Sequence, residues 1–170
     1  MATGPTPWAL ILLGLCGCSD RFVDEAVCVL SVSLSGYITA TMPEEINCGA
    51  MTGGIDLLFQ PEASEHPIAG FDVAVPGVGR GQTGEFPARV IVFGAAGGVW
   101  ETDACSVTIE LHDDRGQVCY RGGHNDDSCE DFDTYRVRGH GECRTPARCP
   151  DGIPITVGPF EFAADVWWPR

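Results

Sequence analysis

Apolar residues alternate with mostly small polar residues from Cys28 to Thr41, and this alternation constrains the fold more than any other feature of the sequence. A period of two matches a β-strand, whose successive side chains point to opposite faces of a sheet. The run therefore predicts one long strand, or two strands joined near Gly36, with one face in a hydrophobic core. The residues expected on that face are Cys28, Leu30, Val32, Leu34, Gly36, Ile38 and Ala40.

Similar short patterns recur along the rest of the chain, and no segment has the period of a helix. Turn residues separate them at intervals of roughly 8–12 residues, which is typical of β-sandwiches. The segment Asp113–Gly116, for example, predicts a turn between two strands. We therefore expect an all-β domain, namely an antiparallel β-sandwich, with a jelly roll as one form of it. The expected strands cover residues 55–59, 71–75, 90–93, 99–100, 105–111, 117–121, 135–143, 155–157 and 160–168.

A second pattern, near the N-terminus, indicates where the protein is sent. Residues 8–15 form an apolar block with the length of a secretory signal core, too short to cross a bilayer as a helix. The block leads into Leu15-Cys16-Gly17-Cys18, which resembles the lipobox of bacterial lipoproteins. The resemblance implies cleavage before Cys18 and acylation of that residue, which becomes the lipid anchor. An ordinary secretory signal is the alternative, because residues 1–7 contain no Arg or Lys.

The cleavage that the resemblance implies makes residues 1–17 a signal peptide, and the composition and length of the rest predict a tether (18–25) and a single domain (26–170). The residue after the anchor is Ser19, and in this the chain resembles the lipoproteins that are sorted to the outer membrane. We therefore expect a cell-envelope protein held on the membrane by its acyl chains. The chain has a net charge of −14 and no basic run. Nucleic acid is not expected as a partner, because its phosphates would be repelled.

Seven cysteines follow the anchor, and in an exported chain they are expected to form disulfides. Short loops are the easiest to close, so neighbouring cysteines are the favoured partners. This reasoning predicts the pairs Cys143–Cys149, Cys119–Cys129 and Cys28–Cys48, and it leaves Cys105 unpaired. A bond between Cys28 and Cys105 is the alternative if their strands are neighbours, and Cys48 would then be unpaired.

Three motifs resemble ligand sites but have simpler explanations. The segment Gly79–Gly84 matches the glycine fingerprint of dinucleotide sites, yet a strand rather than a helix is expected after it, so a loop is predicted. The acidic segment 125–133 offers oxygen ligands for Ca²⁺ but lacks EF-hand spacing, which favours a solvated loop. His112 and His140, on polar strand faces, would form a metal site only if they met across neighbouring strands. No metal and no cofactor are expected.

The adjacent residues Trp167 and Trp168 must point to opposite faces of the last strand, so one is expected in the core and the other at the surface. A surface tryptophan is a candidate contact for a carbohydrate or an envelope protein. No catalytic residue is expected, because the chain has neither a Gly-x-Ser-x-Gly elbow nor an HExxH motif. The leading hypothesis is a non-enzymatic protein that serves binding or structure. The alternative is a metal-dependent envelope hydrolase that uses the histidines and acidic clusters.

Overall fold

The chain forms one antiparallel sheet of ten strands in the computed structural model, which describes residues 27–50, 54–120 and 130–170. The all-β fold expected from the alternation is confirmed, and none of the described residues belongs to a helix that could cross a membrane. The strands are β1 (Cys28–Gly36), β2 (Ala40–Thr41), β3 (Ile46–Ala50), β4 (Ile55–Pro61), β5 (Ile68–Val75), β6 (Gly84–Gly94), β7 (Val99–Tyr120), β8 (Glu130–Cys143), β9 (Ala147–Arg148) and β10 (Pro154–Pro169).

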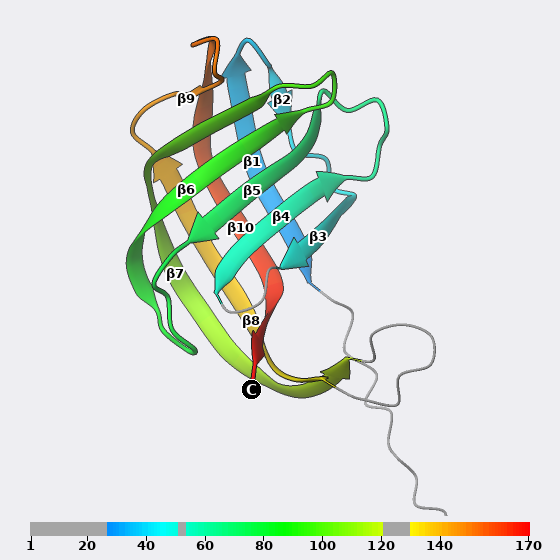
Figure 1. Ribbon diagram of the computed structural model, residues 1–170, viewed down its shortest axis with the longest axis vertical. Helices are drawn as coiled ribbons and strands as arrows, with labels where there is room; N and C mark the ends of the chain where they lie inside the picture. The colour runs from blue at the N-terminus through cyan, green and yellow to red at the C-terminus, as the bar shows by residue number, and fades with distance from the viewer. Residues whose placement is uncertain (1–26, 51–53, 121–129) are drawn as a thin grey trace, which may run out of the picture.

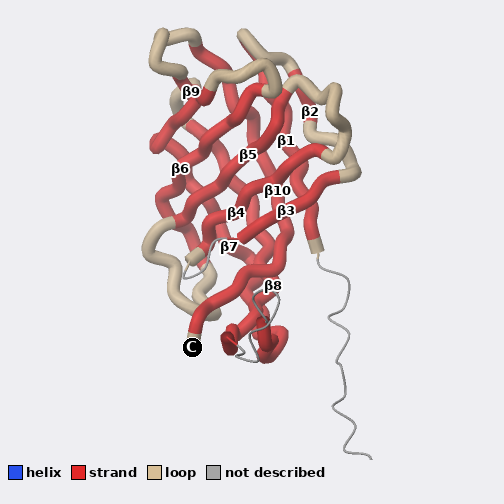
Figure 2. The backbone as a smooth tube through the Cα atoms, turned by 45° about the vertical axis from the view of Figure 1, so that its right-hand side comes forward, coloured by secondary structure: helices blue, strands red, loops and turns tan. Residues whose placement is uncertain are grey.

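The sheet curls over, so that one continuous sheet supplies both layers of a sandwich-like core. Strands β3, β4, β5, β6, β7 and β8 lie side by side in chain order. Strand β10 lies between β8 and β1, and the short β9 pairs with β10 and β7. Figures 1 and 2 show β4, β5 and β6 crossing over β1 and β10. Across the core, the ring centroids of Phe71 in β5 and Phe160 in β10 lie 5.7 Å apart. The strand order is a meander rather than the two Greek keys of a jelly roll.

Strand alternation fills this core as the sequence predicts. In β1 the buried residues are Leu30, Val32 and Leu34. In β10 every second residue from Phe160 to Trp168 is buried. The aromatic rings of β10 lie directly against two glycines of the neighbouring strand, where a larger residue would not fit, and these glycines are Gly139 and Gly141 of β8.

Strand β7 runs unbroken from Val99 to Tyr120, so the turn predicted at Asp113–Gly116 is wrong. The segment forms a β-bulge instead, where the pairing with β8 shifts between Asp114 and Gly116. Gly116 has a φ of 95°, and its N–H donates to Oδ1 of Asp114 over 2.7 Å. Glycine is needed for the positive φ in a bulge as well as in a turn, which is why the same residues suit both.

The strand boundaries differ from the prediction in β3 and β10, and in β1 they decide between its two alternatives. The chain between β1 and β2 bends at Gly36, which has a φ of 106°, so the alternative of two joined strands is the correct one. Strand β3 was not predicted, because Asn47 and Gly49 give it the composition of a turn. Strand β10 continues through residues 158 and 159, where two strands were expected.

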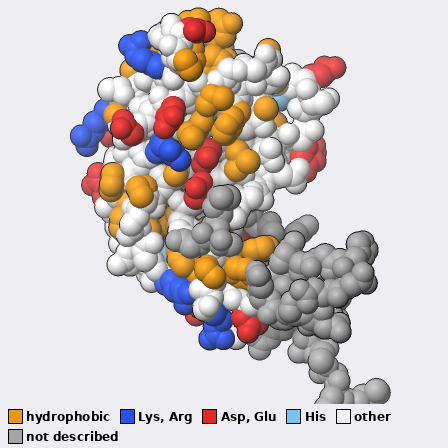
Figure 3. Space-filling model, in the orientation of Figure 1, with side chains coloured by type: hydrophobic (Ala, Val, Ile, Leu, Met, Phe, Trp, Pro, Cys, Tyr) orange, Lys and Arg blue, Asp and Glu red, His pale blue; other side chains and the backbone are white. Residues whose placement is uncertain are grey.

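The outer face of β4, β5 and β6 carries a small apolar cluster. Leu58, Ile91 and Phe93 occupy positions between core residues, so they point away from the core, and they are partly buried there. Leu58 and Ile91 are the register partners of Asp72 in β5, one on each side. Figure 3 shows apolar side chains in the middle of this face with acidic and basic side chains beside them.

Two disulfides link the described strands, and one of them is as predicted. Cys28 is bonded to Cys48, with their Cα atoms 5.7 Å apart. Apart from the two-residue β2, strands β1 and β3 stand at the two ends of the strand order, so this bond joins the edges of the curled sheet. Cys143 is bonded to Cys105, so the predicted Cys143–Cys149 bond is wrong, and so is the expectation that Cys105 is unpaired.

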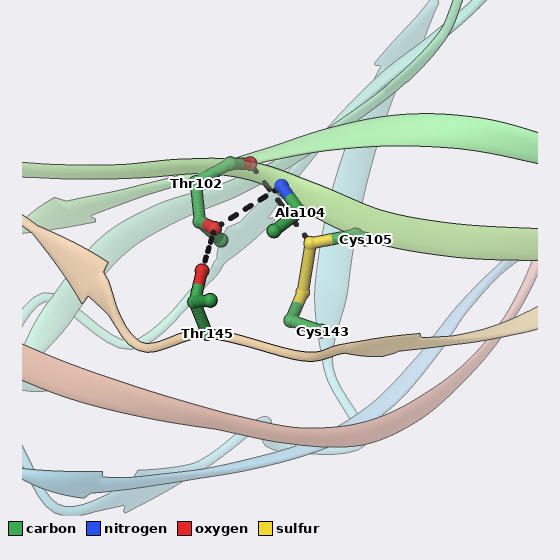
Figure 4. Close-up of a disulfide and its surroundings, with 5 residues drawn as sticks. All are labelled: Thr102, Ala104, Cys105, Cys143 and Thr145. Atoms are coloured by element: carbon green, nitrogen blue, oxygen red, sulfur yellow. Dashed lines mark hydrogen bonds between the residues drawn. A yellow bond between two sulfur atoms is a disulfide. The ribbon is translucent and has the colours of Figure 1, made fainter.

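The Cys105–Cys143 bond follows from the register of the sheet. The two residues are direct partners of β7 and β8, with Cα atoms 4.0 Å apart (Figure 4). Beside the bond, the hydroxyls of Thr102 and Thr145 lie 3.1 Å apart. Strand pairing has already brought these cysteines together, and this outweighs the short sequence spacing to Cys149. Among the described cysteines Cys149 is a free thiol, and the predicted Cys119–Cys129 bond lies outside the described residues.

Candidate functional site

A groove lies on the outer face of β6, β7, β8, β10 and β1. It consists of two adjoining cavities of about 530 and 330 Å³ that share Ser31, His140 and Glu161. We call it the outer-face groove. Its other polar lining residues are Glu85, Ser106, Thr108, Glu110, Arg138 and Glu142.

The polar residues of the outer-face groove form a row that crosses five strands. In register, Glu85 of β6 is opposite Thr108 of β7, which is opposite His140 of β8. His140 is opposite Glu161 of β10, which is opposite Ser31 of β1. Neighbouring strands lie about 4.8 Å apart, so the backbones that carry Glu85 and Glu161 are about 14 Å apart. The row therefore places two carboxylates at a distance set by the sheet, with hydroxyls and an imidazole between or beside them.

One glutamate of the groove is already paired. The register of β7 and β8 shifts between Ile109 and Leu111, and this bulge leaves Glu110 exposed above β8. Its Oε1 lies 3.1 Å from Nδ1 of His140, and its Oε2 lies 3.5 Å from Nε of Arg138. These side chains are about half exposed, so each contact stabilises by at most about 1 kcal/mol. The main effect of the two contacts is that Glu110 pairs with His140 and Arg138, the basic side chains of the groove.

The remaining glutamates keep an excess of negative charge in the groove. The side chains of Glu85, Glu142 and Glu161 make no hydrogen bond or ion pair with any described residue. Each is exposed, so its carboxylate is hydrated and available to a ligand. Carboxylates are hydrogen-bond acceptors only, and hydroxyls can also accept. The arrangement is therefore suited to a ligand that brings positive charge and N–H donors.

His112 and His140, the two histidines considered for a metal site, do not meet, and the expectation that both lie on polar strand faces is wrong for His112. The bulge at Glu110 shifts the alternation of β7, so His112 points into the core with 7% of its surface exposed, whereas His140 is exposed on the outer face. His66 binds the backbone carbonyl oxygens of Thr41 and Ile68. Within the described parts of the chain, no three His, Cys, Asp or Glu side chains are placed to hold a metal ion together.

The two adjacent tryptophans divide as the alternation predicts. Trp168 is buried, and its ring lies 5.2 Å from that of His112 and 5.3 Å from that of Tyr135. It is therefore not accessible as a surface ligand contact, which corrects that part of the prediction. Trp167 is 36% exposed, and its ring lies 6.1 Å from that of Phe132 on the outer side of the sheet.

A pair of carboxyl groups that the sequence did not single out lies on the outer face of β4 and β5. The pKa of Asp72 is raised from 3.8 to about 7, chiefly by burial and also by the charge of the neighbouring Asp56 and a hydrogen bond with it, while Arg89 opposes the shift. The cause of the burial is the apolar cluster of the same face, since Leu58 and Ile91 flank Asp72. Oδ1 of Asp72 is buried without a hydrogen-bond partner among the described residues.

This raised pKa predicts a change of stability with pH that Asp72→Asn should remove. An acid whose pKa is higher in the folded than in the unfolded chain binds its proton more tightly when folded, so its contribution to stability is lost as the pH rises from about 4 to about 7. We expect Asp72→Asn to be more stable than the wild type at pH 8, by about 1–2 kcal/mol after allowing for solvent screening, and similar to it at pH 4. Urea denaturation at both pH values measures the difference. The exposed Asp151→Asn is the control, and an Asp72→Asn curve that stays parallel to the wild type across this range would contradict the prediction.

The other predicted sites have different outcomes. A strand, β6, begins at Gly84, so the segment Gly79–Gly84 is followed by no helix, as expected. In the acidic segment, residues 125–129 lie outside the described residues, while Asp133 forms ion pairs with Arg80 at 2.7 Å and with Arg170 at 3.1 Å. The predicted lipid anchor, Cys18, also lies outside the described residues. No family model, no curated protein and no solved structure matches this chain.

Proposed function

We propose that the protein is a lipid-anchored binding protein of the cell envelope, at the outer membrane, whose outer-face groove binds a small cationic ligand without catalysing a reaction. The observation that carries the proposal is the groove itself, where Glu85, Glu142 and Glu161 have no ion-pair partner among the described residues. The anchor is inferred from the resemblance of Leu15–Cys18 to a lipobox. The acyl chains would hold the protein on the membrane, because two or more chains bind stably where one does not.

The disulfides support a place outside the cytoplasm. Disulfides persist in oxidising compartments and are rare in the cytoplasm, and this chain has two between described strands. Eight residues lie between Cys18 and Val27, so an extended tether would reach about 30 Å. A tether of that length would keep the domain close to the membrane while leaving the groove in water.

The anchor is tested by changing Cys18 to serine. We expect Cys18→Ser to lose acylation and to move from the membrane fraction to the soluble fraction, because the thiol that accepts the diacylglyceryl group is gone. Cell fractionation with mass spectrometry of the N-terminal peptide measures both effects. The matched control is Cys16→Ser, which should remain acylated and membrane-bound. A Cys18→Ser protein that still enters membranes and leaves them only in detergent would show that the anchor lies elsewhere.

The ligand of the outer-face groove is inferred from charge and size. A cavity of about 530 Å³ falls within the range of small-molecule sites. The net charge of −14 attracts cations over the whole surface, and the groove concentrates unpaired carboxylates in one hollow. Because the row from Glu85 to Glu161 is elongated, a linear polyamine with several ammonium groups matches it better than a compact monovalent ion.

This ligand class is tested with spermine as the probe and the purified full chain. We expect spermine to bind in isothermal titration calorimetry at low salt, and Glu161→Gln to weaken the affinity about tenfold through the loss of one charge-assisted hydrogen bond. Glu65→Gln, which removes an equal charge from the loop between β4 and β5, is the matched control and should change the affinity little. Absence of spermine binding by the wild type, or equal weakening by both substitutions, would refute this ligand.

A further inference from the structure

The loop that joins β5 to β6, residues 76–83, folds over one end of the core, and we call it the end loop. Figures 1 and 2 show it near the C-terminal end of β10. Val78 is 6% exposed and belongs to the core. Arg80 forms an ion pair with Asp133 and donates to the backbone oxygen of Pro169. The backbone oxygen of Gln82 lies 2.9 Å from Nδ1 of His112. Four contacts therefore hold the end loop: the apolar burial of Val78, the ion pair and the backbone hydrogen bond of Arg80, and the hydrogen bond through His112.

The contact through His112 fixes the position of a proton. A carbonyl oxygen only accepts hydrogen bonds, so Nδ1 of His112 must carry the hydrogen that binds Gln82. In the neutral ring the hydrogen is then absent from Nε2. This second nitrogen is buried and has no hydrogen-bond partner among the described residues. The ring lies against Tyr135, at 5.0 Å between centroids, and against Trp168 at 5.2 Å. The site thus accepts a neutral imidazole, with one nitrogen satisfied and the other a bare lone pair among aromatic rings.

We propose that His112 is a pH-sensitive contact that holds the Gln82 side of the end loop when neutral and releases it when protonated. Protonation places an N–H on Nε2, where no described residue offers an acceptor, and brings a positive charge into a buried apolar site. Contact with the face of Trp168 offsets part of this cost, because a cation over an aromatic ring is stabilised, but it supplies no hydrogen bond. Movement of the loop admits water, which can hydrate both N–H groups. Protonation of the ring therefore favours opening of the loop.

The charged groups around this end of the core limit how far the loop opens. The loop presents Arg80, strand β8 presents Asp133 beside Tyr135, and Arg170 follows the end of β10. On β7 itself, Asp113 and Asp114 follow His112 and are exposed. Carboxylates and guanidinium groups ordinarily keep their charge between pH 7.5 and pH 5.5. The Arg80–Asp133 ion pair therefore persists in this range, and opening is confined to the segment around Gln82 and Thr83.

Hydrogen–deuterium exchange of the full chain tests this contact. After correction for the intrinsic pH dependence of exchange, we expect protection of the peptide containing residues 81–85 to fall several-fold from pH 7.5 to pH 5.5, while β10 is unchanged. His112→Phe keeps an aromatic ring but has no nitrogen, so its loop should exchange at the fast rate at both pH values. His140→Gln, a histidine change on the outer face, should behave as the wild type.

Two results would overturn the proposal: equal corrected protection at both pH values in the wild type, or a wild-type pH response in His112→Phe. If His112→Phe does not fold, nitrogen NMR of the wild-type ring still decides the question. It should report a hydrogen on Nδ1 alone at pH 7.5 and a second hydrogen that appears at the pH where loop protection is lost. Protonation of the ring without loss of protection would also refute it.

Discussion

Replacing Gly141 with alanine is expected to destabilise the domain by about 3 kcal/mol or more, or to prevent it from folding. A Cβ at this position would lie 2.8 Å from Cε2 of Phe160 and 2.8 Å from the backbone oxygen of Ser106. Neither neighbour can move away easily, because Phe160 is 1% exposed and lies against Phe71, and Ser106 is held in the β7 ladder. Overpacking a filled core usually costs about 1–3 kcal/mol, and a contact with backbone adds to this.

Urea denaturation of Gly141→Ala beside Gly49→Ala separates this packing effect from the general effect of a strand glycine. Gly49 lies in β3, and a Cβ there would meet nothing within 4 Å. Gly49→Ala is therefore expected to change the stability little, or to raise it slightly by restricting the unfolded chain. Equal unfolding midpoints for Gly141→Ala and the wild type would show that the rings of β10 do not lie against β8 as described.

The strands that the sequence predicts best are those in which alternation is not interrupted. The run that begins at Cys28 and the one from Phe160 to Trp168 both place their apolar residues in the core. Strand β7 was divided because Asp113–Gly116 has the composition of a turn, and the composition of a bulge is the same. Each bulge inserts one residue and reverses the faces that follow it, which is how His112 enters the core.

The candidate site could not be predicted for a related reason. Ser31, Glu85, Thr108, His140 and Glu161 lie on five strands that are distant in the sequence, and only the register brings them into one row. Alternation indicates that each faces water, but it does not indicate which neighbours each has. The pairing of Cys105 with Cys143 was missed in the same way, because loop length was used in place of strand register.

Removing the Cys28–Cys48 bond is expected to cost about 2–4 kcal/mol. The bond closes a loop with a sequence separation of 20 residues and joins β1 to β3. These strands do not pair with each other in the ladder of the described sheet, so the bond is the covalent link between its two edges. Without it, each edge exposes unpaired backbone groups and the curled sheet can open along this seam. The double variant Cys28→Ala/Cys48→Ala, studied by urea denaturation, measures the cost.

Comparison with Cys105→Ala/Cys143→Ala decides whether edge closure matters beyond chain entropy. The Cys105–Cys143 loop has a sequence separation of 38 residues, so loop entropy alone makes its removal the more costly one, by about 0.6 kcal/mol. However, β7 and β8 already pair along their whole shared length, whereas β1 and β3 do not. If the Cys28–Cys48 bond holds β1 and β3 together and so keeps the sheet closed, its removal destabilises the domain more than removal of the Cys105–Cys143 bond. Cys149→Ala, which removes a free thiol, is the control and should leave the midpoint nearly unchanged. A smaller loss for the Cys28–Cys48 pair than for the Cys105–Cys143 pair would mean that packing of the core, rather than this bond, keeps the two edges together.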